Sequence, residues 1–161
     1  MAPDVRPAAR TAFAGPEDFI RRVSAAYQAA GAPRDVATLL TAHSGLATGF
    51  GRNVWGANIG VLRAGPTYAG PTMRLSTREW AGTGYRRELA SWRAYDSLAD
   101  SARDVVRLLG APRYREARGL LEAGDVGWFA ALGRAGYYTE PVDRHAPRYA
   151  RALRVVRGVL A

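Results

Sequence analysis

The sequence predicts a mainly α-helical α+β domain, in which a small β-lobe at about residues 52–95 separates two N-terminal helices from four C-terminal ones. Before residue 49 and after residue 97, apolar residues recur at intervals of three and four, which is typical of helices. Between them glycine, proline and aromatic residues are frequent and the helical periodicity is lost. With 161 residues, 48% of them hydrophobic, the chain is long enough for one domain with its own core.

The first expected helix opens at Pro16 with acidic residues in its first turn, where proline and negative charge are both favourable. The second follows Pro33 and ends at Gly49, since glycine accepts the left-handed conformation of a helix end. Its apolar face consists of Val36, Leu39, Leu40, His43 and Ala47. Ala47 therefore belongs to the last turn, where we expect its side chain to point into a cleft closed by the following loop.

The β-lobe and the later helices are predicted from shorter patterns. Residues 73–77 alternate between larger and polar side chains, as in a half-buried strand, and residues 58–63 and 88–95 are further strand candidates. Ser97 with Asp100 resembles a capping box that starts a helix of about twelve residues. Three more helices are expected, beginning at Pro112, after a cap at Asp125, and over residues 147–161.

Residues 1–14 contain arginine, proline and alanine but no apolar run. We expect a flexible N-terminal arm there, followed by a single domain over residues 15–161. The arm lacks the hydrophobic stretch of a secretory signal, and no segment of the chain is long and apolar enough for a membrane span.

The net charge of +9 favours an anionic partner: nucleic acid, an acidic membrane face, or a bacterial envelope of peptidoglycan and teichoic acid. A GC-rich genome would produce the same arginine excess. The arginines are spread over nearly every expected helix, so we expect no nucleic-acid binding. With no cysteine and two histidines, no metal site and no cofactor is expected.

Four motifs in order resemble glycoside hydrolase family 73, the endo-β-N-acetylglucosaminidases of bacterial cell walls. They are residues 46–51 (LATGFG) with 58–61 (NIGV), 75–80 (LSTREW), 92–97 (WRAYDS) and 135–141 (AGYYTEP). The resemblance runs from about Phe19 to the C-terminus. It implies a lysozyme-like domain of two lobes, with a cleft between them that holds a sugar strand.

The resemblance also implies three catalytic positions. Ala47 stands where the family has a glutamate that acts as general acid, Glu79 corresponds to a second acid, and Tyr137 to a cleft tyrosine. Each has a structural alternative: a core alanine, a surface glutamate paired with arginine, and a core aromatic with a satisfied hydroxyl. If the substrate's own acetamido group assists cleavage in place of a second carboxylate, Glu79 has a lesser role.

Six further residues are candidates for substrate binding: His43, Phe50, Trp55, Asn58, Trp80 and Tyr138. The aromatic rings would stack on sugars or pack in the core. Asn58 would fix its loop or contact an acetamido group, and His43 would line the cleft or the core. His43 cannot form a catalytic pair with Ser44, because adjacent helix residues do not face each other.

The function expected from the resemblance is hydrolysis of peptidoglycan glycan strands on the reducing side of N-acetylglucosamine. As written, the chain is expected to be inactive, because a methyl group at position 47 cannot donate a proton. Either a deliberate glutamate-to-alanine substitution or a natural pseudoenzyme explains this. The latter would be a wall-binding or assembly module of a phage tail or secretion machine.

Expected partners are peptidoglycan strands, other anionic envelope polymers, and an immunity or delivery-machine protein. The expected place of action is the bacterial cell wall, in the periplasm or outside the cell. The chain would reach it as a bacteriolytic effector or endolysin, through phage lysis or an injection apparatus, or as part of a larger polypeptide.

Overall fold

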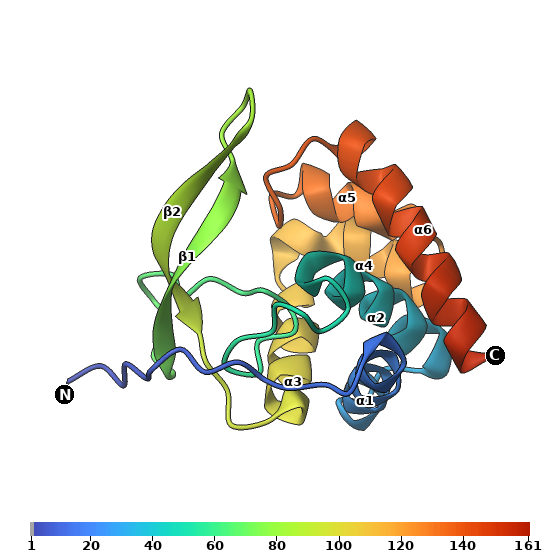
Figure 1. Cartoon of the computed structure of the whole chain (residues 1–161). Helices are drawn as coiled ribbons and strands as arrows, with labels where there is room; N and C mark the ends of the chain where they lie inside the picture. Colours follow the sequence, from blue (N-terminus) through green and yellow to red (C-terminus); the bar gives the residue numbers. More distant parts are fainter. Residues whose placement is uncertain (1) are drawn as a thin grey trace.

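Six α-helices and a two-stranded antiparallel hairpin form the chain in a computed structural model that describes residues 2–161. The elements are α1 (Pro16–Ala29), α2 (Arg34–Thr48), β1 (Thr72–Trp80), β2 (Tyr85–Arg93), α3 (Leu98–Leu109), the 3-10 turn η1 (Pro112–Tyr114), α4 (Arg115–Glu122), α5 (Trp128–Arg134) and α6 (Val142–Leu160). The hairpin stands to one side of the helices (Figure 1). The predicted order of two helices, a β-lobe and four helices is confirmed.

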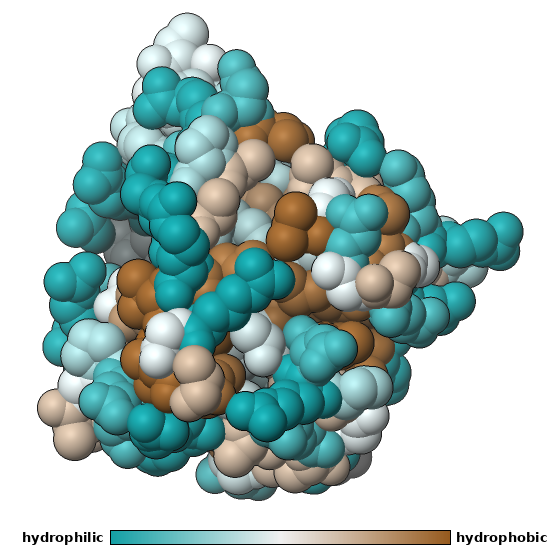
Figure 2. Space-filling model, turned by 90° about the vertical axis from the view of Figure 1, so that its right-hand side faces the viewer, coloured by the Kyte–Doolittle hydropathy of each residue, from teal (hydrophilic) through white to brown (hydrophobic). Residues whose placement is uncertain are grey.

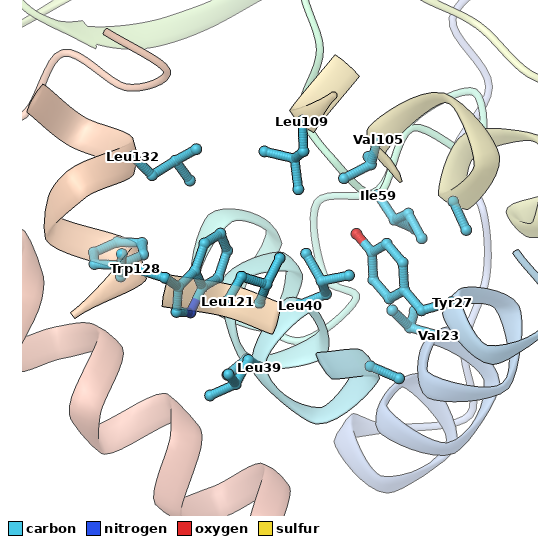
Figure 3. Packing of buried hydrophobic residues seen from close by; sticks show 14 of the residues in the cluster. Val23, Tyr27, Leu39, Leu40, Ile59, Val105, Leu109, Leu121, Trp128 and Leu132 are labelled. Atoms are coloured by element: carbon cyan, nitrogen blue, oxygen red, sulfur yellow. The ribbon is translucent and has the colours of Figure 1, made fainter. Parts of the chain in front are cut away.

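Helix α2 is the centre of the helical body and packs against α1 and α6. Its Leu39 and Leu40 are buried among Tyr27 of α1, Val105 of α3 and Trp128 of α5 (Figure 3). Burying a large apolar side chain contributes roughly 1.5–3 kcal/mol. Packing from several sides therefore holds α2, and the residues in its last turn have a fixed position.

The end of α2 is a tight reversal of the backbone. Gly49 adopts a left-handed conformation with φ of 61°, and its N–H donates to the carbonyl of Gly45. Phe50 is left-handed too, with φ of 53°, and its ring packs on Gly45, where a Cβ atom would lie 2.6 Å from the ring. The predicted helix end at Gly49 is confirmed, and the chain leaves α2 immediately after Ala47 and Thr48.

In the hairpin, Thr72 lies opposite Arg93 and Trp80 opposite Tyr85. The strand predicted at residues 73–77 is confirmed as part of β1. Met73 and Trp92 are buried together at the base of the hairpin, in a small apolar cluster of their own. The β-lobe thus has a separate core beside the helical body.

The strand expected at residues 58–63 is wrong, because this segment is a loop. Ala57 and Val61 have φ of 55° and 52°, which no extended strand adopts. The side chain of Asn58 closes the loop by bonding both the N–H and the carbonyl of Leu62. The candidate at 88–95 is correct in kind but not in its bounds, because β2 begins at Tyr85 and ends at Arg93.

Two predicted helix starts depended on caps. Ser97 accepts a hydrogen bond from the N–H of Asp100 at 3.1 Å, which confirms the start of α3. The expected cap at Asp125 is wrong, because α5 begins later, at Trp128. The Asp125 carboxylate instead accepts from the N–H of Gly127 at 2.8 Å and stabilises the turn before the helix.

The last helix begins at Val142, and Pro147 lies inside it, so the predicted start at Pro147 is wrong. Proline lacks the N–H that would bond four residues back, which ordinarily disfavours it within a helix. The burial of Tyr149, Leu153 and Val156 offsets that loss and keeps the helix continuous. Pattern alone could not weigh these two effects.

The N-terminal segment lies along the domain in extended form. The N–H of Arg6 donates to the carbonyl of Thr72 at 2.7 Å, and the N–H of Thr11 donates to the carbonyl of Val54 at 2.9 Å. These backbone bonds join the segment to the first residue of β1 and to the loop after α2. The segment predicted as an arm therefore contacts the hairpin and the loop that follows α2.

Candidate active-site groove

Two neighbouring cavities lie between the hairpin and the helical body. Their volumes are about 780 and 380 Å³. Both are lined by the same five residues: Ala47, Val61, Arg78, Glu79 and Trp92. Because they share these walls, the two cavities are consecutive sections of one groove. A groove between two lobes is the shape that an extended polymer requires.

Ala47 lies where the two sections meet. On the same helix face, Leu40 and His43 are buried, whereas Ala47 is exposed to the groove. The alternative of a core alanine is thereby excluded. A longer side chain at this position would extend into the groove from a rigid helix, whose own packing sets its direction.

Glu79 of β1 lines both sections together with Ala47. Its side chain is 21% exposed and forms an ion pair of 3.1 Å with Arg63. Arg63 also binds Glu88 of β2 at 3.1 Å, so one guanidinium holds two carboxylates in place. The two alternatives predicted for Glu79 are a groove carboxylate and a carboxylate paired with arginine. In the structure Glu79 is both.

Tyr137 lines the larger section, but its hydroxyl is already engaged. It donates a hydrogen bond of 2.7 Å to the carbonyl of Gly60. Burial raises the pKa of this hydroxyl well above its ordinary value, so Tyr137 is neutral at physiological pH. The Tyr137 hydroxyl therefore fixes the loop at Gly60. A direct hydrogen bond from Tyr137 to the substrate stays a prediction.

His43 is buried behind the larger section, with its ring among those of Trp128, Phe129 and Tyr137 at centroid distances of 5.9, 5.9 and 5.1 Å. Neither ring nitrogen has a hydrogen-bond partner among residues 2–161. Burial lowers the pKa of His43 to about 3, so the imidazole is neutral at physiological pH. His43 is thus part of both the core and the cleft wall.

Three of the predicted aromatic contacts lie at the groove. Trp55 lines the smaller section, and Trp80 and Tyr138 line the larger one. The Arg144 guanidinium lies over the Trp80 ring at 4.7 Å, and the Tyr138 hydroxyl donates to the carbonyl of Phe129 at 2.8 Å. The Arg10 guanidinium lies over the Trp55 ring at 5.2 Å, so both tryptophans have an arginine on one face, whereas Tyr138 is tied to the helical body.

The other two predicted contacts have structural tasks in this arrangement. Phe50 lines neither section and packs instead against Phe19, with ring centroids 6.2 Å apart. The buried Asn58 amide donates to the carbonyls of Leu62 and Arg93 at 3.0 Å and accepts from the N–H of Leu62 at 2.9 Å. Of its two predicted roles, this geometry supports fixing the loop.

Sequence reasoning missed the arginines and one tryptophan of the groove. Trp92 lines both sections, and Arg113, Arg144 and Arg148 line the larger one. On the face shown in Figure 2, hydrophilic residues surround apolar ones that gather toward the middle. The strand alternation at Met73 could have indicated the Trp92 position. Arg144 and Arg148 lie one turn apart on α6 and Arg113 lies in η1, and no common motif joins them.

No group of three or more histidine, aspartate or glutamate side chains within residues 2–161 is arranged to hold a metal ion. Over the same residues, none of the helices combines the length and the apolar character that crossing a membrane requires.

The chain is 30% identical over 162 residues to the peptidoglycan hydrolase FlgJ of Pseudomonas aeruginosa, a match that takes in 94% of this chain but 40% of that protein. It superposes on a peptidoglycan hydrolase mutant from Sphingomonas sp. A1 with a TM-score of 0.72 and 26% identity, covering 89% of this chain and 97% of the other. A truncated glycoside hydrolase domain of Salmonella typhimurium FlgJ gives a TM-score of 0.65 at 24% identity, over 89% and 99% of the two chains. No protein-family model matches.

The resemblance predicted from the four motifs is thereby confirmed in both sequence and fold. The chain has the two-lobed, lysozyme-like fold of these glycoside hydrolases.

Proposed function

We propose that this chain, which shares its fold and 26–30% of its sequence with bacterial peptidoglycan hydrolases, binds the glycan strand of peptidoglycan in its groove. The bond addressed is the one on the reducing side of N-acetylglucosamine. One observation carries the proposal: the vacated acid position Ala47 and the carboxylate Glu79 line the same two sections of the groove. A proton-donor position on α2 and a carboxylate on β1 that line one polymer-shaped groove suit a glycosidase.

In this proposal the missing side chain is the general acid. Cleavage of a glycosidic bond releases an alkoxide that needs a proton as the bond breaks, and a general acid contributes about 10²–10⁴-fold. Ala47 has no proton to give, so the chain binds glycan and scarcely cleaves it. Glu79 would then stabilise positive charge on the sugar or activate water, and the substrate's acetamido group is the alternative helper.

A second function is also consistent with alanine at position 47, whose methyl side chain cannot act as a general acid. A natural wall-binding module would keep the groove and lose the acid, and would serve a phage tail or a secretion machine. Both functions place the chain at the bacterial cell wall, with delivery by phage lysis, by an injection apparatus or within a larger polypeptide.

The test is muropeptide release from purified sacculi by the chain, by Ala47→Glu and by Ala47→Gln. We expect only Ala47→Glu to release fragments, ending in reducing N-acetylglucosamine, because glutamine has the same shape but no acidic proton. Fragments ending in reducing N-acetylmuramic acid would contradict the choice of bond. Three inactive proteins that all sediment with sacculi would favour the wall-binding module. Three that neither cut nor sediment would overturn the proposal.

A further inference from the structure

Two arginines face each other on the hairpin beside the smaller section of the groove. Arg78 of β1 and Arg87 of β2 are directly opposite in the antiparallel register, so their side chains project from the same face. Both are exposed, and both line the smaller section. Like charges in directly opposed positions destabilise a sheet. The pair therefore carries an electrostatic cost that the fold itself does not require.

The hairpin has no acid left to offset this charge. Its two glutamates, Glu79 and Glu88, are both paired with Arg63. Among residues 2–161 no carboxylate lies within ion-pair distance of Arg78 or Arg87. The two guanidiniums are thus free to bind an anion from the groove.

Arg78 is also held in a defined place. Its guanidinium lies over the ring of Tyr85 at 5.0 Å from the centroid. Trp55 and Trp92 line the same section and provide the apolar surface on which a sugar ring can rest. The section therefore combines ring-binding surface with a paired positive charge on its wall.

The rest of the groove reinforces the positive charge. The larger section is lined by six arginines and two glutamates. Four of these arginines have carboxylate partners: Arg63 pairs with Glu79, Arg93 with Asp104 at 2.8 Å, and Arg144 and Arg148 both with Glu140. The groove keeps an excess of positive charge, which attracts a polymer with regular negative charge and gives no such attraction to a neutral one.

We propose that Arg78 and Arg87 select sugar strands that carry carboxylates on substituents of the ring. A planar guanidinium binds a carboxylate through two parallel hydrogen bonds, so a pair of them distinguishes a charged substituent from a neutral one. In peptidoglycan the carboxylate has two sources: the lactyl group of muramic acid once its peptide is removed, or the stem peptide itself. This inference rests on the proposed function and adds to it a class of substrate.

The test uses the chain as it stands, since an inactive protein allows equilibrium binding to be measured by calorimetry. Four probes of equal sugar length distinguish the possibilities: a neutral N-acetylglucosamine oligomer, a peptide-free peptidoglycan oligomer with free lactyl carboxylates, the same oligomer with its carboxylates converted to methylamides, and an oligomer that retains its stem peptides. We expect at least tenfold tighter binding of the lactyl or the peptide form than of the methylamide, and the tighter of the two identifies the source.

Variants assign the preference to the pair. We expect the double variant Arg78→Gln with Arg87→Gln to lose the preference while still binding the neutral oligomer. Arg74→Gln is the matched control, because Arg74 is an exposed arginine of the same hairpin that lines neither section. Without ligand, the double variant should unfold at nearly the same temperature, since the like-charge contact that it removes and the contact of Arg78 with the Tyr85 ring that it also loses offset each other.

Equal affinity for the acidic and methylamide oligomers would overturn the proposed preference for carboxylates while leaving the proposed glycan binding intact. The same would follow if the double variant kept the preference or if Arg74→Gln lost it. Binding of none of the oligomers would overturn the proposed function as well. Tighter binding of a DNA oligonucleotide than of any oligomer would show that the arginines serve nucleic acid instead.

Discussion

The hydroxyl of Tyr137 donates a hydrogen bond of 2.7 Å to the carbonyl of Gly60, joining the loop after α5 to the loop that enters the β-lobe. The contact is close on both sides, because a Cβ atom at Gly60 would clash with Val105 and lie 3.3 Å from the Tyr137 hydroxyl. The same tyrosine ring packs against His43, one turn before Ala47. Tyr137 thus couples one groove wall to the helix that carries Ala47.

Replacing Tyr137 by phenylalanine should destabilise the fold by about 1–3 kcal/mol, because the buried carbonyl of Gly60 loses its donor. Urea unfolding would measure the change. Tyr85→Phe is the matched control, since Tyr85 is 40% exposed and a surface substitution usually changes stability by less than about 0.5 kcal/mol. Equal stability of Tyr137→Phe and the parent protein would show that the bond to Gly60 contributes nothing.

Stability should fall as the solution is acidified below pH 6.5. The pKa of His43 is about 3 in the folded protein, against an ordinary 6.5. Between these values the unfolded chain binds the proton and the folded chain does not, so the stabilisation is complete above 6.5 and is lost as pH falls. Each pH unit costs about 1.4 kcal/mol. Burial also lowers the pKa of His145, which acts in the same direction.

The variant His43→Gln isolates the His43 contribution, because glutamine does not titrate. Urea unfolding of the parent and the variant at pH 7 and pH 5 should give a smaller loss for the variant, by about 2 kcal/mol. NMR should show no protonation of His43 above pH 4.5. A titration of His43 near pH 6.5 would mean that its ring is open to water in solution.

In the Ala47→Glu protein, Glu79→Gln should lower the rate of muropeptide release by about 10²-fold or more if Glu79 assists at the reacting sugar. Glu88→Gln is the control, because Glu88 shares Arg63 with Glu79 but lines neither section of the groove. A loss of threefold or less in Glu79→Gln would assign the assistance to the substrate's acetamido group. Equal large losses in both variants would indicate an effect through Arg63.

Replacing Asn58 by alanine should cost about 2–4 kcal/mol of stability, because one buried amide satisfies the carbonyls of Leu62 and Arg93 and the N–H of Leu62. Asn53→Ala is the matched control, since Asn53 is exposed at the same groove. Thermal and urea unfolding of both would measure this. If Asn58→Ala kept its stability and lost glycan affinity, Asn58 would be a ligand contact after all.

The periodicity of the sequence determined much of the architecture by itself. Apolar spacing located both N-terminal helices, Ser97 located the start of α3, and Gly49 located the end of α2. These features are local, since a helix face or a cap involves residues within one or two turns of each other. For the same reason, the sequence alone places Ala47 in the last turn of its helix.

The tertiary structure decided which groups reach the groove and which serve the fold. Phe50 lies against Phe19, Asn58 binds Arg93 across the lobe, and Tyr137 binds Gly60 from 77 residues away. It also placed Arg78 opposite Arg87, which depends on the register of the hairpin. Such contacts join distant parts of the chain, and their free energy depends on burial and partners that a local pattern does not contain.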